Sequence, residues 1–484
     1  MKKYYSGLPK EVFWDMSLAE SVNGVKLKMH EPIRKGTVLT CDKPWEGAYC
    51  GYGKIVFDGE KYRLYYRGRG SSDGAQRTDI GDHGVWCVAY SYDGKTFTRP
   101  DLGIFDFGGD SHNNIVMQLP NYNIDNFSIT FDENPNCHPD ERYKAFLGDD
   151  TQVVRTLHYY VSRDGTHFEE REAIKAAGRF DSLNVCFWDE KTQRYCLYLR
   201  GLHNADPERK IPYEIENHVR DVRVSYSTDM EEWTEPVRLE YGENDTDEIQ
   251  LYTNNIGRYE GTDIFLGIPT RYIDRSKDAQ NYNHLPDILG FRPMLTEKYG
   301  RVGTAMTEAM LMTSRDGLHF ERTNEAFFTP GIENRENWVY GDGYFIYGWI
   351  ETSSDFEGEP NELSLYVGKG YIARPVNFER YTLRMDGFFS WRADYEGGEA
   401  ITKPFTFEGS ELRLNFSTSA LGYLRVEILD EDGNAIEGYD SGRLFGNSTD
   451  RPCDFERPLS DLAGKPIRFK LSMRDADLYA FKFI

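Results

Sequence analysis

Four acidic residues stand at the start of segments that are expected to form strands in successive repeats of the chain: Glu46, Asp125, Asp181 and Glu248. If these strands surround one channel, repulsion between the carboxylates raises the pKa of some and leaves others ionised. Hydrolysis of a glycosidic bond needs such a division, with a protonated acid for the leaving oxygen and a carboxylate as base or nucleophile. Asp125 and Asp181 are the preferred catalytic pair, because they hold equivalent places in adjacent repeats.

Basic, aromatic and amide side chains accompany these acids. Four arginines are expected at the ends of second strands, on the same side as the carboxylates: Arg67, Arg69, Arg200 and Arg271. Each could keep a carboxylate ionised or bind an acidic sugar, and each could equally tie one repeat to the next. Four further residues are placed to contact a sugar, although the aromatic ones can also pack between sheets: Trp45, Tyr49, Asn337 and Trp338.

A turn of the pattern Ser-x-Asp-Gly-x-x-aromatic recurs along the chain and indicates how the strands are joined. It occurs at 91–97, 162–168 and 314–320, and again at 227–233 with Met230 in place of the glycine. The Asp carboxylate can accept bonds from nearby backbone N–H groups, and Gly supplies a positive φ. We interpret the unit as structural, and it resembles the Asp-box of sialidase-type propellers.

Two-strand hairpins accompany these turns. The first spans 55–66, and related pairs are expected at 129–147, 187–199, 258–266 and 340–347, each followed by a further strand. Repetition at roughly 60 to 85 residues, with four strands per unit, is typical of a radial β-propeller. The sequence therefore predicts an all-β protein in which residues 1–385 form a five-bladed β-propeller that is the catalytic domain; an irregular array of β-sandwiches is the alternative.

The sequence pattern changes near residue 386. Segments 412–416, 424–428 and 467–471 alternate apolar and polar residues, as expected for antiparallel strands with one solvated face. We predict a C-terminal β-sandwich domain over residues 386–484.

The long insertions indicate which face of the propeller carries the site. They fall at 68–84, 201–219 and 271–300, always between a second and a third strand. In a blade this loop lies at the same end as the start of the first strand, whereas the Asp-Gly turns lie at the other. Long loops gathered on one face of a rigid scaffold are where binding is expected.

In these repeats and acids the chain resembles the five-bladed propeller glycosidases of glycoside hydrolase families 43, 62, 32, 68, 117 and 130. The resemblance implies working acids on the first strands of successive blades and, in some members, a C-terminal β-sandwich. The chain departs from it in Glu46, where families 43 and 32 have Asp, and in Asp181, where family 43 has Glu. The Asn-Asp-Pro-Asn and Arg-Asp-Pro motifs of family 32 are absent, and Glu248 is a rival for the acid.

Net charge and the numbers of cysteines and histidines indicate which classes of ligand and partner the protein binds. A net charge of −23 argues against nucleic acid or an anionic membrane, and leaves a carbohydrate substrate. Seven cysteines without paired spacing and ten histidines without ligand spacing predict neither a cofactor nor a catalytic metal, with a structural calcium in the channel left open. The first residues show no apolar leader, so a cytoplasmic location is expected.

Three functions fit these observations. The favoured one is a glycoside hydrolase that removes a terminal sugar from a glycan or oligosaccharide. The second is a sialidase-like hydrolase of an acidic sugar, which requires three converging arginines. The third is a non-catalytic carbohydrate-binding propeller, for which a gathering of acids has no purpose.

Overall fold

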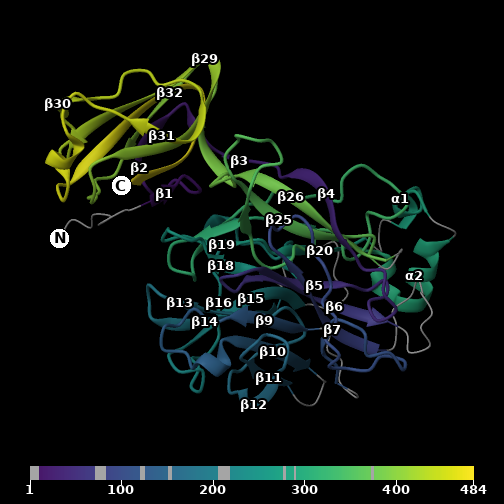
Figure 1. The fold of residues 1–484 in the computed structure, drawn as a ribbon. Helices are drawn as coiled ribbons and strands as arrows, with labels where there is room; N and C mark the ends of the chain where they lie inside the picture. The colour runs from purple at the N-terminus through teal and green to yellow at the C-terminus, as the bar shows by residue number, and fades with distance from the viewer. Residues whose placement is uncertain are drawn as a thin grey trace.

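The structure is a computed structural model that describes residues 10–70, 83–119, 126–150, 155–204, 218–275, 279–287, 290–371 and 375–484. It consists mostly of strands, as predicted. Figure 1 shows two bodies, a larger one that contains most of the strands and a smaller one around the C-terminal strands. In the described part of the chain, no helix is long and apolar enough to span a membrane.

The larger body contains five four-stranded antiparallel sheets among the described residues. The first three are β5 (Gly51–Phe57), β6 (Tyr62–Gly70), β7 (His83–Ser91) and β8 (Ile115–Met117); β9 (Phe127–Phe131), β10 (Tyr143–Asp150), β11 (Arg155–Ser162) and β12 (Glu169–Ile174); and β13 (Val185–Asp189), β14 (Arg194–Asn204), β15 (His218–Ser227) and β16 (Val237–Arg238). In each, the strands follow one another in chain order, so the expected hairpins at 55–66, 129–147 and 187–199 are present.

The fourth repeat is longer than the others. Its sheet consists of β18 (Ile256–Arg258), β19 (Phe265–Gly267), β22 (Met312–Ser314) and β23 (Phe320–Arg322). A three-stranded sheet extends it through β17 (Gln250–Leu251), β20 (Thr270–Asp274) and β21 (Ala305–Ala309). The insertion between β20 and β21 carries the helices α1 (Ala279–Tyr282) and α2 (Phe291–Tyr299) and the 3₁₀ turn η4 (Gly300–Gly303). Further 3₁₀ turns are η1 (Pro139–Glu141), η2 (Gly242–Asn244) and η5 (Leu459–Leu462).

The fifth sheet differs from the predicted hairpin at 340–347. Its strands are β24 (Ile350–Thr352), β25 (Glu362–Lys369), β26 (Asn377–Arg384) and, from the start of the chain, β4 (Ile33–Thr40). Gly341 and Gly343 adopt φ values of 107° and 69°, which turn the chain before it can form a regular strand. The N-terminal β4 therefore supplies the fourth strand and joins the first and last repeats.

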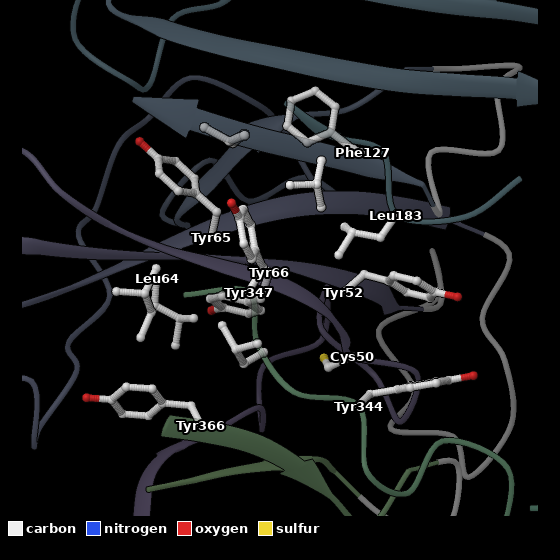
Figure 2. Close-up of a cluster of buried hydrophobic side chains, with 14 of the residues drawn as sticks. Cys50, Tyr52, Leu64, Tyr65, Tyr66, Phe127, Leu183, Tyr344, Tyr347 and Tyr366 are labelled. Carbon is white, nitrogen blue, oxygen red and sulfur yellow. The ribbon is translucent and has the colours of Figure 1, made fainter. Parts of the chain in front are cut away.

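The first strands of four of the sheets lie side by side around a ring. β5 contacts β9, β9 contacts β13, and β13 contacts β18. The ring closes through residues 345–347, since the Ile55 N–H donates to the Tyr347 carbonyl at 2.9 Å and the Tyr347 N–H to the Gly53 carbonyl at 2.8 Å. Figure 2 shows the tyrosine-rich core that packs at this junction.

The smaller body is a nine-stranded sheet system that uses both ends of the chain. Its strands are β1 (Lys10–Val12), β2 (Ala19–Asn23), β3 (Val25–Met29), β27 (Phe389–Ala393), β28 (Gly398–Thr402), β29 (Leu412–Asp430), β30 (Ala435–Asp440), β31 (Asn447–Cys453) and β32 (Ile467–Phe483). The expected division at residue 386 gave 10–29 to the propeller, whereas these residues pair with C-terminal strands, as in Lys10↔Lys482 and Val25↔Ala393. Buried Phe13 and Leu18 pack in the C-terminal core, which explains the difference.

The four Asp turns join the third and fourth strands of the first four sheets. In the second sheet, Asp164 accepts the N–H groups of Thr166 and His167 at 2.8 and 2.9 Å. A tyrosine from the preceding sheet donates its hydroxyl to the turn glycine in three repeats: Tyr366 to Gly94, Tyr65 to Gly165 and Tyr198 to Gly317. The Asp turns thus fasten one sheet to the next.

Candidate functional site

The ends of the second strands lie beside the starts of the first strands. The registers Gly51↔Arg67, Phe127↔Leu147 and Val185↔Tyr198 place them at one end of each sheet. Arg67 and Arg200 therefore lie at the end where the first strands begin, as predicted. We call this end of the sheets the first-strand face.

Seven tyrosines, all but Tyr49 buried, pack together near this face, and we call them the tyrosine cluster: Tyr49, Tyr52, Tyr252, Tyr272, Tyr340, Tyr344 and Tyr371. Their rings are linked pairwise, with centroids 5.6 Å apart for Tyr52 and Tyr344 and 4.8 Å apart for Tyr49 and Tyr371. Tyr340 donates to the Tyr252 hydroxyl at 2.6 Å. Figure 2 shows the Tyr52 and Tyr344 hydroxyls pointing to the same side. Burial raises the pKa of Tyr52 well above its usual value, so its hydroxyl remains protonated.

Arg67, Arg200 and Arg220 lie against the tyrosine cluster. The Arg67 guanidinium is 4.1 Å from the Tyr49 ring centroid and 4.7 Å from that of Tyr52, and it donates to the Tyr371 hydroxyl at 2.8 Å.

Arg200 and Arg220 share the Tyr252 ring, at 4.6 and 5.8 Å from its centroid, and Arg220 is also 4.7 Å from the Tyr272 centroid. The arrangement concentrates positive charge over an aromatic surface.

Asp181 lies at the edge of this surface. Its side chain is 66% exposed, with one carboxylate oxygen 3.5 Å from Arg200 Nη1. Its other oxygen accepts the Asn126 side-chain amide at 3.2 Å. Asp125, the other member of the preferred pair, lies outside the described residues, directly before Asn126 in the chain. The structure thus brings the neighbour of Asp125 into contact with Asp181.

Glu46 and Glu248 have different surroundings. Glu46 is fully buried, where its carboxylate accepts bonds from Tyr66 at 2.5 Å and from Arg99 at 2.7 Å. Burial raises the pKa of Glu46, and Arg99 opposes that rise. These contacts tie the segment after β4 to the first sheet. Glu248 is exposed, and its backbone N–H donates to the Thr246 hydroxyl.

The remaining predicted binding residues have partners within the protein. Arg271 binds Glu308, and the buried Trp45 donates its indole N–H to Asn114 at 2.9 Å. Asn337 donates to the carbonyls of Pro330 and Ile332, and Trp338 donates to the Gly331 carbonyl. The Arg69 guanidinium lies 5.9 Å from the Tyr49 ring centroid.

Two features of this face were missed by sequence reasoning. Arg220 lies near the start of the third strand β15, a position for which the sequence pattern predicts no binding residue. Asp342 follows the first glycine of the 340–343 turn, within residues 340–347, for which the sequence predicts a hairpin. It is buried, accepts the Val339 N–H at 3.0 Å, and burial raises its pKa to about 6. An Asp between two glycines was the available signal.

The described residues contain no group of three or more His, Cys, Asp and Glu side chains arranged to hold a metal ion.

No family model and no curated protein matches the chain. Similar solved structures include an N-acetylgalactosamine deacetylase from F. plautii in complex with blood group B trisaccharide, with 12% identity over 76% of this chain and 97% of that one and a TM-score of 0.45. A Bombyx mori β-fructofuranosidase of family GH32 has 8% identity over 94% of each chain and a TM-score of 0.42. A structure from work on GH130 hydrolases that target β-1,2 mannosidic linkages in Candida mannan has 12% identity over 73% of this chain and 94% of that one and a TM-score of 0.40. At these scores the function must be argued from the residues of this chain.

Proposed function

We propose that the chain is a glycoside hydrolase whose larger body is a five-bladed β-propeller and whose smaller body is a β-sandwich. The five four-stranded sheets and the ring of first strands support the propeller. The active site then lies on the first-strand face, over the tyrosine cluster. Aromatic rings and hydroxyl groups at this face suit a sugar, which has apolar faces and a polar rim.

The observation that carries the proposal is the Asn126–Asp181 contact beside Arg200. The exposed Asp181 carboxylate lies next to a cation and contacts Asn126, the residue that directly follows Asp125 in the chain. An exposed carboxylate beside a fixed positive charge suits the base or nucleophile, and Asp125 is then the acid that protonates the leaving oxygen.

The separation of the two carboxyl groups decides the stereochemical course. About 5.5 Å permits attack by Asp181 on the anomeric carbon to form a glycosyl ester; water deprotonated by Asp125 then displaces Asp181 from that carbon, and the two inversions give net retention. Roughly 6.5 to 9.5 Å leaves room for a water molecule that attacks directly and gives inversion. In the second case Asp181 accepts the proton of the attacking water. In both cases Asp125 donates a proton to the departing oxygen as the C–O bond breaks.

The test is hydrolysis of a panel of aryl glycosides and oligosaccharides by the purified full chain. We expect release of a terminal sugar from at least one member, and loss of that activity in Asp125→Asn and in Asp181→Asn. Binding of sugars without turnover across the panel would identify a carbohydrate-binding propeller instead. Full activity in both variants would refute the assignment of Asp125 and Asp181 as the catalytic pair.

A further inference from the structure

Arg200 is the most unusual charged group on the first-strand face. Its side chain is 8% exposed, and its Nε is buried without a hydrogen-bond partner among the described residues. Nη2 donates to the Tyr252 carbonyl at 3.0 Å, and Nη1 has Asp181 at 3.5 Å. An arginine remains charged at all physiological pH values, so this buried charge is incompletely compensated within the protein.

Other positive charges lie near Arg200. Arg220 shares the Tyr252 ring with it, and the charges of both Arg67 and Arg200 act on the Tyr52 hydroxyl. Like charges gathered in a poorly solvated place repel one another unless an anion lies between them. Asp181 is a weak counter-ion for Arg200, because it is mostly exposed and its contact with Arg200 is long.

We propose that Arg200, with Arg67 and Arg220, forms a subsite for an anionic substituent of the glycan, a carboxylate or a sulfate. This inference rests on the proposed function only in assuming that the ligand is a sugar. The sugar ring would lie on the tyrosine cluster, and its anionic group would take charge-assisted hydrogen bonds from Arg200. A neutral sugar would leave the Arg200 charge uncompensated, so charged sugars bind more tightly.

Binding of single sugars to the full chain tests the subsite without any need for turnover. The panel holds glucose, galactose and mannose with the corresponding hexuronic acids and hexose 6-sulfates, measured by calorimetry. We expect at least one charged member to bind about ten- to hundredfold more tightly than its neutral parent, with affinity that falls as salt rises. The carboxylate and sulfate series tell the two anions apart. Equal affinity for charged and neutral members, or binding by no member, overturns the proposal.

Two substitutions assign the effect to Arg200. Arg200→Gln is expected to remove the preference for the charged sugar while the neutral parent binds as before, and Arg200→Lys to keep part of it. Arg171→Gln is the matched control, because Arg171 is an exposed arginine on β12 with ion pairs to Glu141 and Glu169. Circular dichroism checks that each variant is folded. An unchanged preference in folded Arg200→Gln contradicts the assignment, and if that variant is unfolded, the salt dependence of the unmodified chain decides.

The binding experiments and the hydrolysis experiments can fail independently, so the subsite and the hydrolase activity are tested separately. Charged sugars that bind but whose glycosides are not cleaved would support the subsite and refute the hydrolase. Cleavage of neutral glycosides alone would support the hydrolase and refute the subsite.

Discussion

The two ends of the propeller sheets use aspartate in opposite ways. At the Asp turns, Asp164 is fixed by backbone N–H groups of its own turn; partial burial would raise its pKa, but the bonds from His167 and Thr166 lower it overall. At the first-strand face, Asp181 contacts only side chains in the described residues and is mostly exposed, whereas Asp342 is buried with a raised pKa. The comparison of Asp164 with Asp181 teaches that backbone bonds of its own turn immobilise a carboxylate, while a carboxylate with only side-chain contacts stays exposed to a ligand.

The largest expected effect tests the first-strand face. Asp181→Asn keeps the shape of the side chain but removes the charge, so turnover on a responsive glycoside should fall about a hundredfold or more. Thermal unfolding should change little, because the carboxylate is exposed. Steady-state kinetics and calorimetry measure the two quantities. The control is Asp140→Asn, an exposed acid in η1 that should leave both unchanged; a fall in stability with normal turnover per folded molecule would make Asp181 structural.

Asp342 gives the next largest effect. Its contribution to the free energy of unfolding should change with pH in the opposite direction to that of the Asp turns. Its pKa is raised to about 6 in the folded chain, above the value of about 3.9 in an unfolded chain. Its contribution to stability is therefore fully present below pH 4 and is lost as pH rises through 6. The free energy of unfolding should fall by about 2 kcal/mol from this group between pH 4 and pH 8. Asp342→Asn should remove that part of the fall, as measured by urea unfolding at several pH values; identical pH profiles would refute the raised pKa.

The Asp turns should show a smaller effect of the opposite sign. Asp164→Ala loses two backbone hydrogen bonds, which should lower the free energy of unfolding by about 1 to 2 kcal/mol at neutral pH. Because the folded pKa is lowered, this contribution is present above the unfolded value and is lost as pH falls. The difference between the variant and the unmodified chain should therefore shrink on acidification. Turnover per folded molecule should stay the same, and a large loss would place this turn at the active site.

Local patterns predicted much of the fold, whereas partners distant in sequence could not be predicted. The Asp-Gly turn and alternating residues of 55–66 specify a hairpin by themselves, and the structure contains it as β5 and β6. The role of β4 depends on pairing with β26, more than three hundred residues later, and no local signal carries that information. The hairpin expected at 340–347 was wrong because two glycines at positive φ favour a turn over a strand.

The candidate site shows the same limit. The ends of the second strands could be counted from the hairpins, so Arg67 and Arg200 were placed at the right end of the sheets. The direction of a side chain could not be predicted in the same way. The Glu46 carboxylate points into the interior and binds Arg99, which comes from the loop after the first Asp turn. Such a pairing depends on burial and on a partner from another element.

The smallest effect concerns the tyrosines that fasten one sheet to the next. Tyr65 donates from the first sheet to the Gly165 carbonyl in the second at 2.9 Å. Gly165 allows this approach, because a Cβ there would lie 2.4 Å from the Tyr65 hydroxyl. The third repeat lacks the turn glycine, and the sheet before it has Phe146 three residues after Tyr143, where the first sheet has Tyr65 three residues after Tyr62. The glycine and the hydroxyl are therefore absent together.

Tyr65→Phe should therefore lower the free energy of unfolding by about 1 kcal/mol, the value of one buried hydrogen bond, with no change in turnover. Tyr226→Phe is the matched control, since no hydrogen bond of the Tyr226 hydroxyl is found among the described residues, and it should be neutral. Urea unfolding of both variants measures the difference. Equal stability of the two would mean that the hydroxyl does not fasten the sheets. Reduced turnover in Tyr65→Phe at unchanged stability would show that the Asp-turn end of the sheets affects the chemistry at the first-strand face. The two ends would then not have separate structural and catalytic roles.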